Sequence, residues 1–541
     1  MNKKMLKATA VLLLFCLTVS MFAACAAEIE APAVSDPAPE TEIASVPTEA
    51  PVPETTVPVI EPGTPVLLED MPETDITFVP AEITLPQSTL DRYAYIPQVY
   101  ADMPQIYIDT EDGSNSFATE YTLGDKLLDK IEYVDATVSI DNCAQDMMMS
   151  GVEANVKVRG NFTLNYVKKP LRIKFEKKQN MLGLHNGEKF KNWVLLADWK
   201  DLSMQNNVMA FYLGNTILGS DGYYCTDFRN VEVYLNGEYW GVYLLVEQQE
   251  AKDGKFHIPE VEDDYEGTDI GYLFEYDGYY TSEQQIPNGG GDPTFVIDHY
   301  DMPFTQPGYT VKSDINHDSQ LAFLSGYVQN VYDIVYSATQ KQEYKGFNDD
   351  CTGLIDGKFD NAQDAIAACI DIQSLVDTYI LNEIACDPDV AWSSFYVSLD
   401  MSQQGNKKLT FEGPWDFDSA FGINLDHYLT DIMYVQDSLN PWLTLLKNEE
   451  WFQTLVREKW DELKQAGVLD NALALSLYHK DKFRQNYAFN AERWPSRLTE
   501  DNSELCSEVN ACTSQGQAAD YQYNWLKARF AYLDSIWSKA E

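Results

Sequence analysis

The chain has 541 residues, of which 45% are hydrophobic, and its formal net charge at pH 7 is −47. That length is ample for a large core and indicates more than one structural unit. Because so acidic a surface repels other polyanions, the composition excludes nucleic acid and anionic membrane surfaces as direct partners. The charge is also typical of an ordinary secreted acidic protein, so by itself it identifies no site.

The N-terminus has the pattern of a secretory signal. Three lysines within the first seven residues precede an apolar run over 10–22, and two alanines stand directly before Cys25. This order predicts a signal peptide over residues 1–24. The cysteine resembles the lipid-bearing cysteine of bacterial lipoproteins, which implies an extracytoplasmic protein anchored to the bacterial cell membrane through Cys25. An ordinary signal peptide followed by an incidental cysteine is the alternative.

Residues 25–88 are predicted to form an extended linker. They are rich in Pro, Thr, Ala, Glu and Val, and no Lys or Arg occurs between Cys25 and Arg92. Frequent prolines and like charges keep such a segment extended. The linker would hold the globular region, predicted over 89–541, away from the membrane surface. After residue 24 no apolar run reaches the roughly 20 residues that a membrane-spanning helix needs.

The first part of the globular region, about 89–300, is predicted to be rich in strands. Alternation of apolar and polar residues predicts the strands, and Asn236-Gly237 between two such runs predicts a hairpin. The predicted strands are 105–109, 135–140, 156–161, 170–175, 193–197, the hairpin 231–246, and 271–277. Asp201 begins a predicted helix that extends to about residue 218, and a glycine-rich loop covers 288–291.

The second part, about 301–541, is predicted to be mostly helical. Apolar residues recur at three- and four-residue spacing in 318–335 and 371–384. Further predicted helices are 448–466, 470–490 and 520–538, and a short predicted strand over 408–411 leads toward the acidic residues described below. Strands first and helices later indicate an α+β fold of two lobes, a β-rich N-terminal lobe and a helical C-terminal lobe.

The nine cysteines include no Cys-x-x-Cys pair, so the sequence favours no zinc site. Cys506 and Cys512 are spaced to close a local loop, whereas Cys369 and Cys386 are predicted to be buried residues of helices. Disulfides form outside the cytoplasm, but the sequence does not determine their pairing.

Acidic residues gather in two segments of the second part. Asp387 and Asp389 flank a proline that prevents the preceding helix from continuing, and Ser394 follows. Asp416 and Asp418 alternate at the end of a predicted strand, which would point them to opposite faces. A kinase-type reaction needs one carboxylate to orient the accepting hydroxyl and others to hold Mg²⁺ on the ATP phosphates. Solvated acidic loops are the alternative, because the chain has 85 acidic residues.

The densest positive cluster lies on one predicted strand. It comprises Lys168, Lys169, Arg172 and Lys174, and alternation places the last two on one face. A lysine on a strand of the first lobe is what a nucleotide phosphate needs. The alternative is a strand edge that lysines keep in solvent.

Five motifs in the same order resemble the CotH (spore coat protein H) kinases, which are atypical bacterial protein kinases. They are Val158-Arg-Gly-Asn-Phe-Thr163, Val167-Lys-Lys-Pro-Leu-Arg-Ile-Lys174, Trp193-Val-Leu-Leu-Ala-Asp-Trp-Lys-Asp201, the hairpin Leu235–Glu247 and Gly413-Pro-Trp-Asp-Phe-Asp-Ser-Ala-Phe-Gly422. The resemblance covers about residues 100 to 425. Because several motifs occur in order, the set is more specific than any single motif.

The resemblance implies an atypical, two-lobed protein-kinase-like fold that binds ATP and Mg²⁺ and phosphorylates Ser or Thr of a protein substrate. The implied site residues are Asp389 for catalysis; Asp416, Asp418 and Ser394 for the metal; and Lys168, Lys169, Arg172 and Glu247 for the nucleotide. In this assignment Glu247 lies near the nucleotide or pairs with Lys168.

The chain departs from the family pattern in three places. Ser394 stands where a kinase usually has Asn, Asn206-Asn207 stands where the family often has Arg-Asn, and the helix after Asp201 contains no acid to pair with a lysine. The alternative function is therefore an inactive cell-surface scaffold that binds cell-wall polysaccharide through some of its 33 tyrosines and 11 tryptophans. The sequence leaves the protein substrate, the source of ATP outside the cell and the oligomeric state open.

Overall fold

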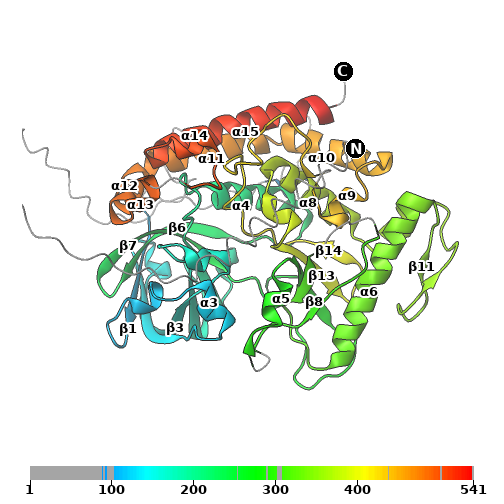
Figure 1. Ribbon diagram of the computed structural model, residues 1–541, viewed down its shortest axis with the longest axis horizontal. Coiled ribbons are helices and arrows are strands. Elements are labelled where there is room, and N and C mark those ends of the chain that lie inside the picture. Colours follow the sequence, from blue (N-terminus) through cyan, green and yellow to red (C-terminus); the bar gives the residue numbers. More distant parts are fainter. Residues whose placement is uncertain are drawn as a thin grey trace, which may run out of the picture. The chain divides into compact units, whose positions relative to one another are not determined.

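The computed structural model describes residues 88, 92–93, 103–252, 254–287, 290–300, 307–435, 438–499 and 502–538. The predicted signal peptide, Cys25 and the linker as far as residue 87 lie outside these residues, as do 288 and 289 of the glycine-rich loop. Helices and strands both contribute to the fold, in agreement with the predicted α+β class (Figure 1). Within the described part of the chain, no helix is both long and apolar enough to cross a bilayer.

The strands of the first part close into a barrel in the order β1-β2-β3-β4-β5-β7-β6. Neighbouring strands are antiparallel except for β1 and β6, whose parallel pairing closes the barrel. Buried aliphatic side chains from alternate positions fill its interior. The strands are β1 (Gln105–Thr110), β2 (Val134–Asp141), β3 (Met149–Val158), β4 (Leu171–Gln179), β5 (Phe190–Leu196), β6 (Phe228–Leu235) and β7 (Glu238–Glu247).

Strand β3 ends earlier than the sequence pattern predicts. The predicted strand continued to Asn161, whereas β3 ends at Val158. Gly160 has a φ of 110°, and a Cβ at this position would stand 2.1 Å from the Thr163 hydroxyl oxygen. The glycine therefore allows the chain to turn out of the barrel, and Arg159 lies at the turn instead of in the strand.

A second sheet has the order β14-β13-β8-β10-β9. Its strands are β8 (Gly271–Asp277), β9 (Thr294–Phe295), β10 (Gly308–Val311), β13 (Phe395–Asp400) and β14 (Leu409–Phe411), and a separate pair joins β11 (Gly346–Phe347) to β12 (Leu354–Ile355). The second sheet thus takes strands from both sides of residue 300, near which the sequence pattern changes from β-rich to helical. The two-lobed arrangement remains a prediction.

Helix α8 lies at the centre of the helical part and contacts α4, α10, α15 and β14. The predicted helices over 318–335 and 371–384 are confirmed as α6 and α8, but the helix predicted over 470–490 is divided into α11 and α12 at Phe483, whose ψ of 14° is not helical. The helices are α3 (Leu123–Leu127), α4 (Asn206–Ile217), α5 (Tyr280–Glu283), α6 (Asp318–Tyr336), α7 (Ala362–Ala367), α8 (Ile372–Ala385), α9 (Pro441–Thr444), α10 (Glu450–Gln465), α11 (Val468–Lys482), α12 (Arg484–Arg493), α13 (Ser496–Thr499), α14 (Ser507–Asn510) and α15 (Gln515–Trp537).

Helix α4 is almost completely buried, because all of its residues except Asn215 are covered. The Asp201 carboxylate stabilises the start of the helix by accepting hydrogen bonds from the backbone N–H groups of Gln205 and Asn206, at 2.7 and 2.8 Å. The predicted helix is therefore present, but it begins at Asn206 and not at Asp201. Cys369 and Cys386 are buried as predicted, but they lie just beyond the ends of α7 and α8 and not within a helix. Every cysteine in the described residues is a free thiol.

Candidate active site

The first acidic loop follows α8. The helix ends where Cys386 adopts a left-handed φ of 48°, two residues before the proline that prevents its continuation. The Asp387 carboxylate accepts a hydrogen bond from the Asp389 N–H at 3.2 Å and so begins the 3₁₀ turn η9 (Pro388–Ala391). No described residue donates a hydrogen bond to the Asp389 carboxylate. The loop therefore fixes the backbone of Asp389 and leaves its side chain available to an external group.

The second acidic loop follows β14, and here the prediction from alternation is wrong. Strand β14 ends at Phe411, and Asp416 has a left-handed φ of 65°, so neither Asp416 nor Asp418 belongs to a strand. The strict alternation of a strand does not apply in such a turn, and the two side chains are not forced to opposite faces. Within the described part of the chain, the Asp416 carboxylate accepts no hydrogen bond.

Helix α4 holds the second loop in place. The Asn207 side chain donates to Asp198 Oδ1 at 2.7 Å and accepts from the Phe417 N–H at 2.9 Å. The Asn206 side chain donates to the Ala420 carbonyl at 2.9 Å. The Asn206-Asn207 pair, which departs from the family pattern in sequence, thus fixes the backbone on both sides of Asp418.

The negative charges of Asp389, Asp416 and Asp418 act on one another. Burial raises the pKa of Asp389 to about 7, and the Asp418 charge adds to this effect. Burial, followed by the charges of Asp418 and Asp389, raises the pKa of Asp416 well above its ordinary value. Burial also raises the pKa of Asp418, although Lys200 opposes this. Both loops therefore contribute to one cluster of interacting carboxylates.

The positive charge of Lys200 acts on two members of this cluster, Asp389 and Asp418. Its ammonium group donates to the Ser419 hydroxyl oxygen and to Glu504 Oε2, each at 2.9 Å. Burial lowers the pKa of Lys200, but the charges of Asp418 and Glu504 outweigh it and raise the value overall. Lys200 therefore offsets part of the negative charge of the second loop.

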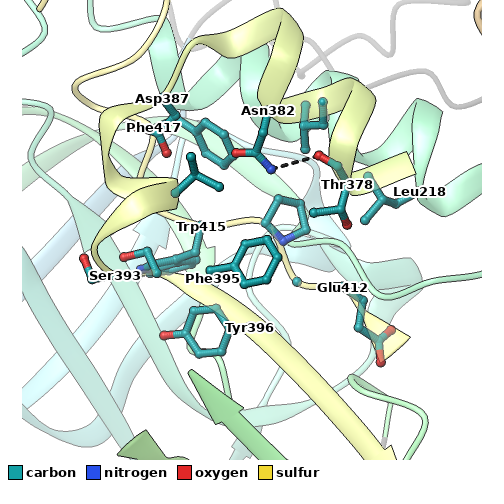
Figure 2. A pocket seen from close by; sticks show the side chains of 15 residues that line it. Leu218, Thr378, Asn382, Asp387, Ser393, Phe395, Tyr396, Glu412, Trp415 and Phe417 are labelled. Atoms are coloured by element: carbon teal, nitrogen blue, oxygen red, sulfur yellow. Dashed lines mark hydrogen bonds between the residues drawn. The ribbon is translucent and has the colours of Figure 1, made fainter. Parts of the chain in front are cut away.

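Ser394 precedes β13 and has a left-handed φ of 60°. Its N–H donates to Glu275 Oε1 at 2.7 Å, and the other oxygen of that carboxylate lies 3.4 Å from the Lys312 ammonium group. Ser394, Phe395 and Trp415 line a cavity of about 20 Å³ between the two acidic loops (Figure 2). That volume admits about one water molecule, so the cavity is too small for a nucleotide.

The predicted phosphate-binding lysines have other contacts. Lys168 is 1% exposed, and its ammonium group donates to the carbonyls of Ala197, at 2.9 Å, and Val242. Lys169 is also buried and donates to two carbonyls of the preceding turn. Burial lowers the pKa of Lys168 to about 7, against the opposing charge of Asp198. Both ammonium groups thus bind backbone carbonyls, and no contact joins them to the carboxylates of the two acidic loops in the described structure.

Glu247, the last residue of β7, lies in a different environment. Its side chain is fully buried and accepts hydrogen bonds from the Tyr224 hydroxyl and the Asp227 N–H, both at 3.1 Å. The predicted pair between Glu247 and Lys168 does not form, because each side chain is already bound to other groups. The glutamate therefore braces the end of β7 against the segment that leads into β6.

A protein-family model described as CotH kinase protein matches residues 156–528. The chain belongs to the CotH kinase family. The matched region extends from the end of β3 into α15, so it contains both acidic loops and α4. No curated protein matches the chain.

The acidic cluster of this CotH-family protein has the chemistry that a divalent cation requires. Its carboxylates raise one another's pKa, and those of Asp389 and Asp416 accept no hydrogen bond from the described residues, so a bound cation would relieve their repulsion. In the same part of the chain, no group of three or more His, Cys, Asp or Glu side chains could by itself hold a metal ion. Mg²⁺ is typically held through one or two carboxylates together with substrate phosphates and water, and the carboxylates of Asp389 and Asp416 are of the type that it uses.

Arg159 is a site residue that the sequence interpretation missed. Its guanidinium carbon lies 5.5 Å from the centre of the Trp415 ring, and Trp415 directly precedes Asp416 in the chain. The charges of Asp416 and Glu275 both act on it, as does the like charge of Arg172. Among the predicted nucleotide residues, Arg172 thus acts electrostatically on Arg159. The sequence feature that points to Arg159 is the glycine after it, because a glycine favours a turn at the end of the strand.

Proposed function

We propose that this CotH-family protein transfers the γ-phosphate of ATP to a Ser or Thr hydroxyl of a protein substrate in the presence of Mg²⁺. The observation that carries this proposal is the approach of two loops, one with Asp389 and one with Asp416 and Asp418, whose charges raise one another's pKa. Family membership supports a kinase-type reaction.

In the proposed reaction, Asp389 accepts the proton of the acceptor hydroxyl. The hydroxyl oxygen forms a bond to the γ-phosphorus while the bond to the ADP oxygen breaks, and ADP retains that electron pair. A pKa of about 7 suits the Asp389 carboxylate for this transfer near neutral pH. Asp387 holds the Asp389 backbone through its N–H and so orients the carboxylate.

Asp416 and Asp418, with Ser394 beside them, are the residues that would hold Mg²⁺. The ion would neutralise the charge of the phosphates and of the departing ADP. The backbone around Asp416 and Asp418 is fixed by Asn207, so their carboxylates need little rearrangement to bind the ion.

Purified full-length chain tests this function with radiolabelled ATP, Mg²⁺ and a bacterial protein extract as acceptor. We expect protein labelling by the wild type and loss of about 100-fold or more in Asp389→Asn and Asp416→Asn. Asp109→Asn, which removes an exposed acid from β1, is the matched control. Labelling that survives in Asp389→Asn would remove the catalytic assignment.

We also propose that the protein acts outside the cytoplasm, anchored by a lipid on Cys25. The support is the basic and apolar N-terminus, the two alanines before Cys25 and the linker after it. Metabolic labelling with radioactive palmitate in a bacterial host checks this anchor. Label in the wild type that disappears in Cys25→Ala is the expected result, and equal labelling of both chains would contradict it.

A further inference from the structure

The guanidinium group of Arg159 has no ion pair and no hydrogen bond to any described residue. It carries five N–H donors in a planar fork, and such donors are costly to leave unused where water is partly excluded. The side chain is half-buried, and its observed contact is the face of Trp415. A half-buried guanidinium with free donors beside Asp416 is a suitable partner for an anion that binds at the acidic cluster.

Arg159 continues a row of cations on the outer face of the barrel. Lys157 precedes it by two residues near the end of β3, and the Arg159 N–H continues the β3–β4 pairing by donating to the Pro170 carbonyl at 3.0 Å. Arg172 is the register partner of Lys157 on β4. Both Lys157 and Lys174 lie over the Tyr133 ring, at 4.5 and 5.7 Å. We call Lys157, Arg159, Arg172 and Lys174 the cationic face.

Only part of this positive charge is balanced by the protein. Arg172 pairs with Glu250 at 3.3 Å, whereas Lys157 has no ion pair to a described residue. Burial and the like charge of Arg172 lower the pKa of Lys157. An anionic ligand bound at the cationic face would offset the repulsion among these cations.

The cationic face reaches the second acidic loop through Arg159, whose guanidinium group lies over the ring of Trp415, the residue before Asp416. A ligand that binds both the carboxylates and the cationic face carries a metal ion for the carboxylates and several negative charges for the cations. The magnesium complex of a nucleoside triphosphate has this chemistry, and guanidinium groups bind phosphate oxygens in bidentate fashion. An acidic acceptor peptide would satisfy the cations but not the carboxylates.

We infer that Arg159, supported by Lys157 and Arg172, binds the phosphate chain of the nucleotide, the role that the sequence assigned to Lys168. This inference rests on the proposed phosphotransfer function and identifies the cation that the function needs. Arg159 contacts the phosphates rather than the base, so its contribution increases with the number of phosphates on the nucleotide.

Calorimetric titration of the full-length chain with MgATP, MgADP and AMP tests the inference. Arg159→Ala is expected to weaken MgATP binding by about tenfold or more and AMP binding by less than about twofold. Arg159→Lys keeps the charge but not the fork, so its MgATP affinity is expected between those of Arg159→Ala and the wild type. Lys178→Ala, which removes an exposed lysine from β4, is expected to bind like the wild type.

The outcomes separate the inference from the function. A wild type that binds no MgATP overturns both. A wild type that binds MgATP equally well after Arg159→Ala overturns only the role of Arg159. Equally weaker binding of all three nucleotides indicates that the arginine only supports Trp415, and this result also overturns the role of Arg159. Thermal melting of each variant shows whether the fold is retained. In transfer assays the expected change is a higher KM for ATP, and a higher KM for the protein acceptor alone assigns the cationic face to the acceptor instead.

Discussion

The side chain of Asn207 joins Asp198 to the backbone of Phe417, so one amide holds a loop on each side of α4. Asn207→Ala is expected to lower phosphotransfer by about tenfold or more, because the Asp416 and Asp418 backbone loses its anchor. The loss of two buried hydrogen bonds also lowers stability by about 1–3 kcal/mol. Activity assays and chemical denaturation measure the two effects.

An exchange of side chains provides the control for Asn207. In the double variant Asp198→Asn/Asn207→Asp, the asparagine at position 198 donates to the aspartate at position 207. That aspartate also accepts from the Phe417 N–H. Asn207→Asp alone leaves two carboxylates facing each other, whereas Asp198→Asn alone can still accept from Asn207 through its amide oxygen. We expect the double variant to recover most of the stability that Asn207→Asp loses, and an additive loss would show that the two side chains do not act as a pair.

The part of the fold that sequence predicted best is governed by local chemistry. Asn236 and Gly237 have φ values of 50° and 77°, as expected of the tight turn that Asn-Gly favours, and the hairpin lies where the pattern placed it. The Asp201 carboxylate accepts hydrogen bonds from the first turn of α4, and Pro388 has no N–H with which α8 could continue. The closure of the barrel by β1 and β6 was not predictable, because pairing between distant strands leaves no local pattern.

The acidic residues of the site were predictable, but the cations were not. Asp389, Asp416 and Asp418 carry an unusual local density of charge and stand in recognisable motifs. The choice among Lys168, Lys169 and Arg159 depends on which side chains the barrel buries, and that depends on where β3 ends. Alternation extended the predicted strand through Arg159, although the glycine that follows it favours a turn, so this residue was not predicted to lie at the site.

Arg529 and Glu383 form an ion pair at 2.7 Å in which both side chains are fully buried. Glu383 also accepts from the N–H groups of Tyr434 and Val435, so the pair fixes a segment whose Tyr434 hydroxyl donates to the Asp387 carbonyl. Arg529→Met is expected to destabilise the fold by about 3–5 kcal/mol, because it leaves a buried carboxylate without its partner. Denaturation midpoints measure the loss.

The control for Arg529 is Lys527→Met, which removes an exposed cation from the same helix α15. Its expected change in stability is within about 0.5 kcal/mol. Similar destabilisation by both substitutions would show that net charge, rather than the buried pair, determines the effect.

Lys168→Met tests the structural role of the buried lysine. The variant leaves the carbonyls of Ala197 and Val242 without their donor, and the expected loss of stability is about 1–3 kcal/mol. The affinity of the folded variant for MgATP is expected to stay within about twofold of the wild type, since the ammonium group does not contact the acidic loops. Calorimetry at a temperature where the variant is fully folded measures this, and a tenfold weaker affinity would return Lys168 to the nucleotide site.

Glu412 makes stability depend on pH. Burial raises its pKa from 4.5 to about 7, against the opposing hydrogen bonds from the Ser398 hydroxyl and the Tyr224 N–H. The folded state therefore binds more protons than the unfolded state between these values. The stabilisation is fully present below pH 4.5 and is lost as the pH rises through about 7.

Glu412→Gln resembles the protonated side chain at every pH. Its amide can accept from the Tyr224 N–H and donate to the Ser398 hydroxyl. We expect a higher melting temperature than the wild type at about pH 8 and little difference at about pH 4. Glu111→Gln, at an exposed position, is expected to show no such pH-dependent gap. A constant difference between Glu412→Gln and the wild type across this range would contradict the assignment.

The repulsion among Asp389, Asp416 and Asp418 predicts that function and stability oppose each other at this site. Asp416→Asn removes one of the three interacting charges, so in the absence of divalent ions the variant is expected to melt at a higher temperature than the wild type. Mg²⁺ is expected to raise the melting temperature of the wild type by binding the folded state, and to have little effect on the variant. Melting curves in MgCl₂ and in NaCl of equal ionic strength separate binding from screening. Asp109→Asn should respond to Mg²⁺ like the wild type, whereas an Mg²⁺ response that survives in Asp416→Asn would place the ion elsewhere.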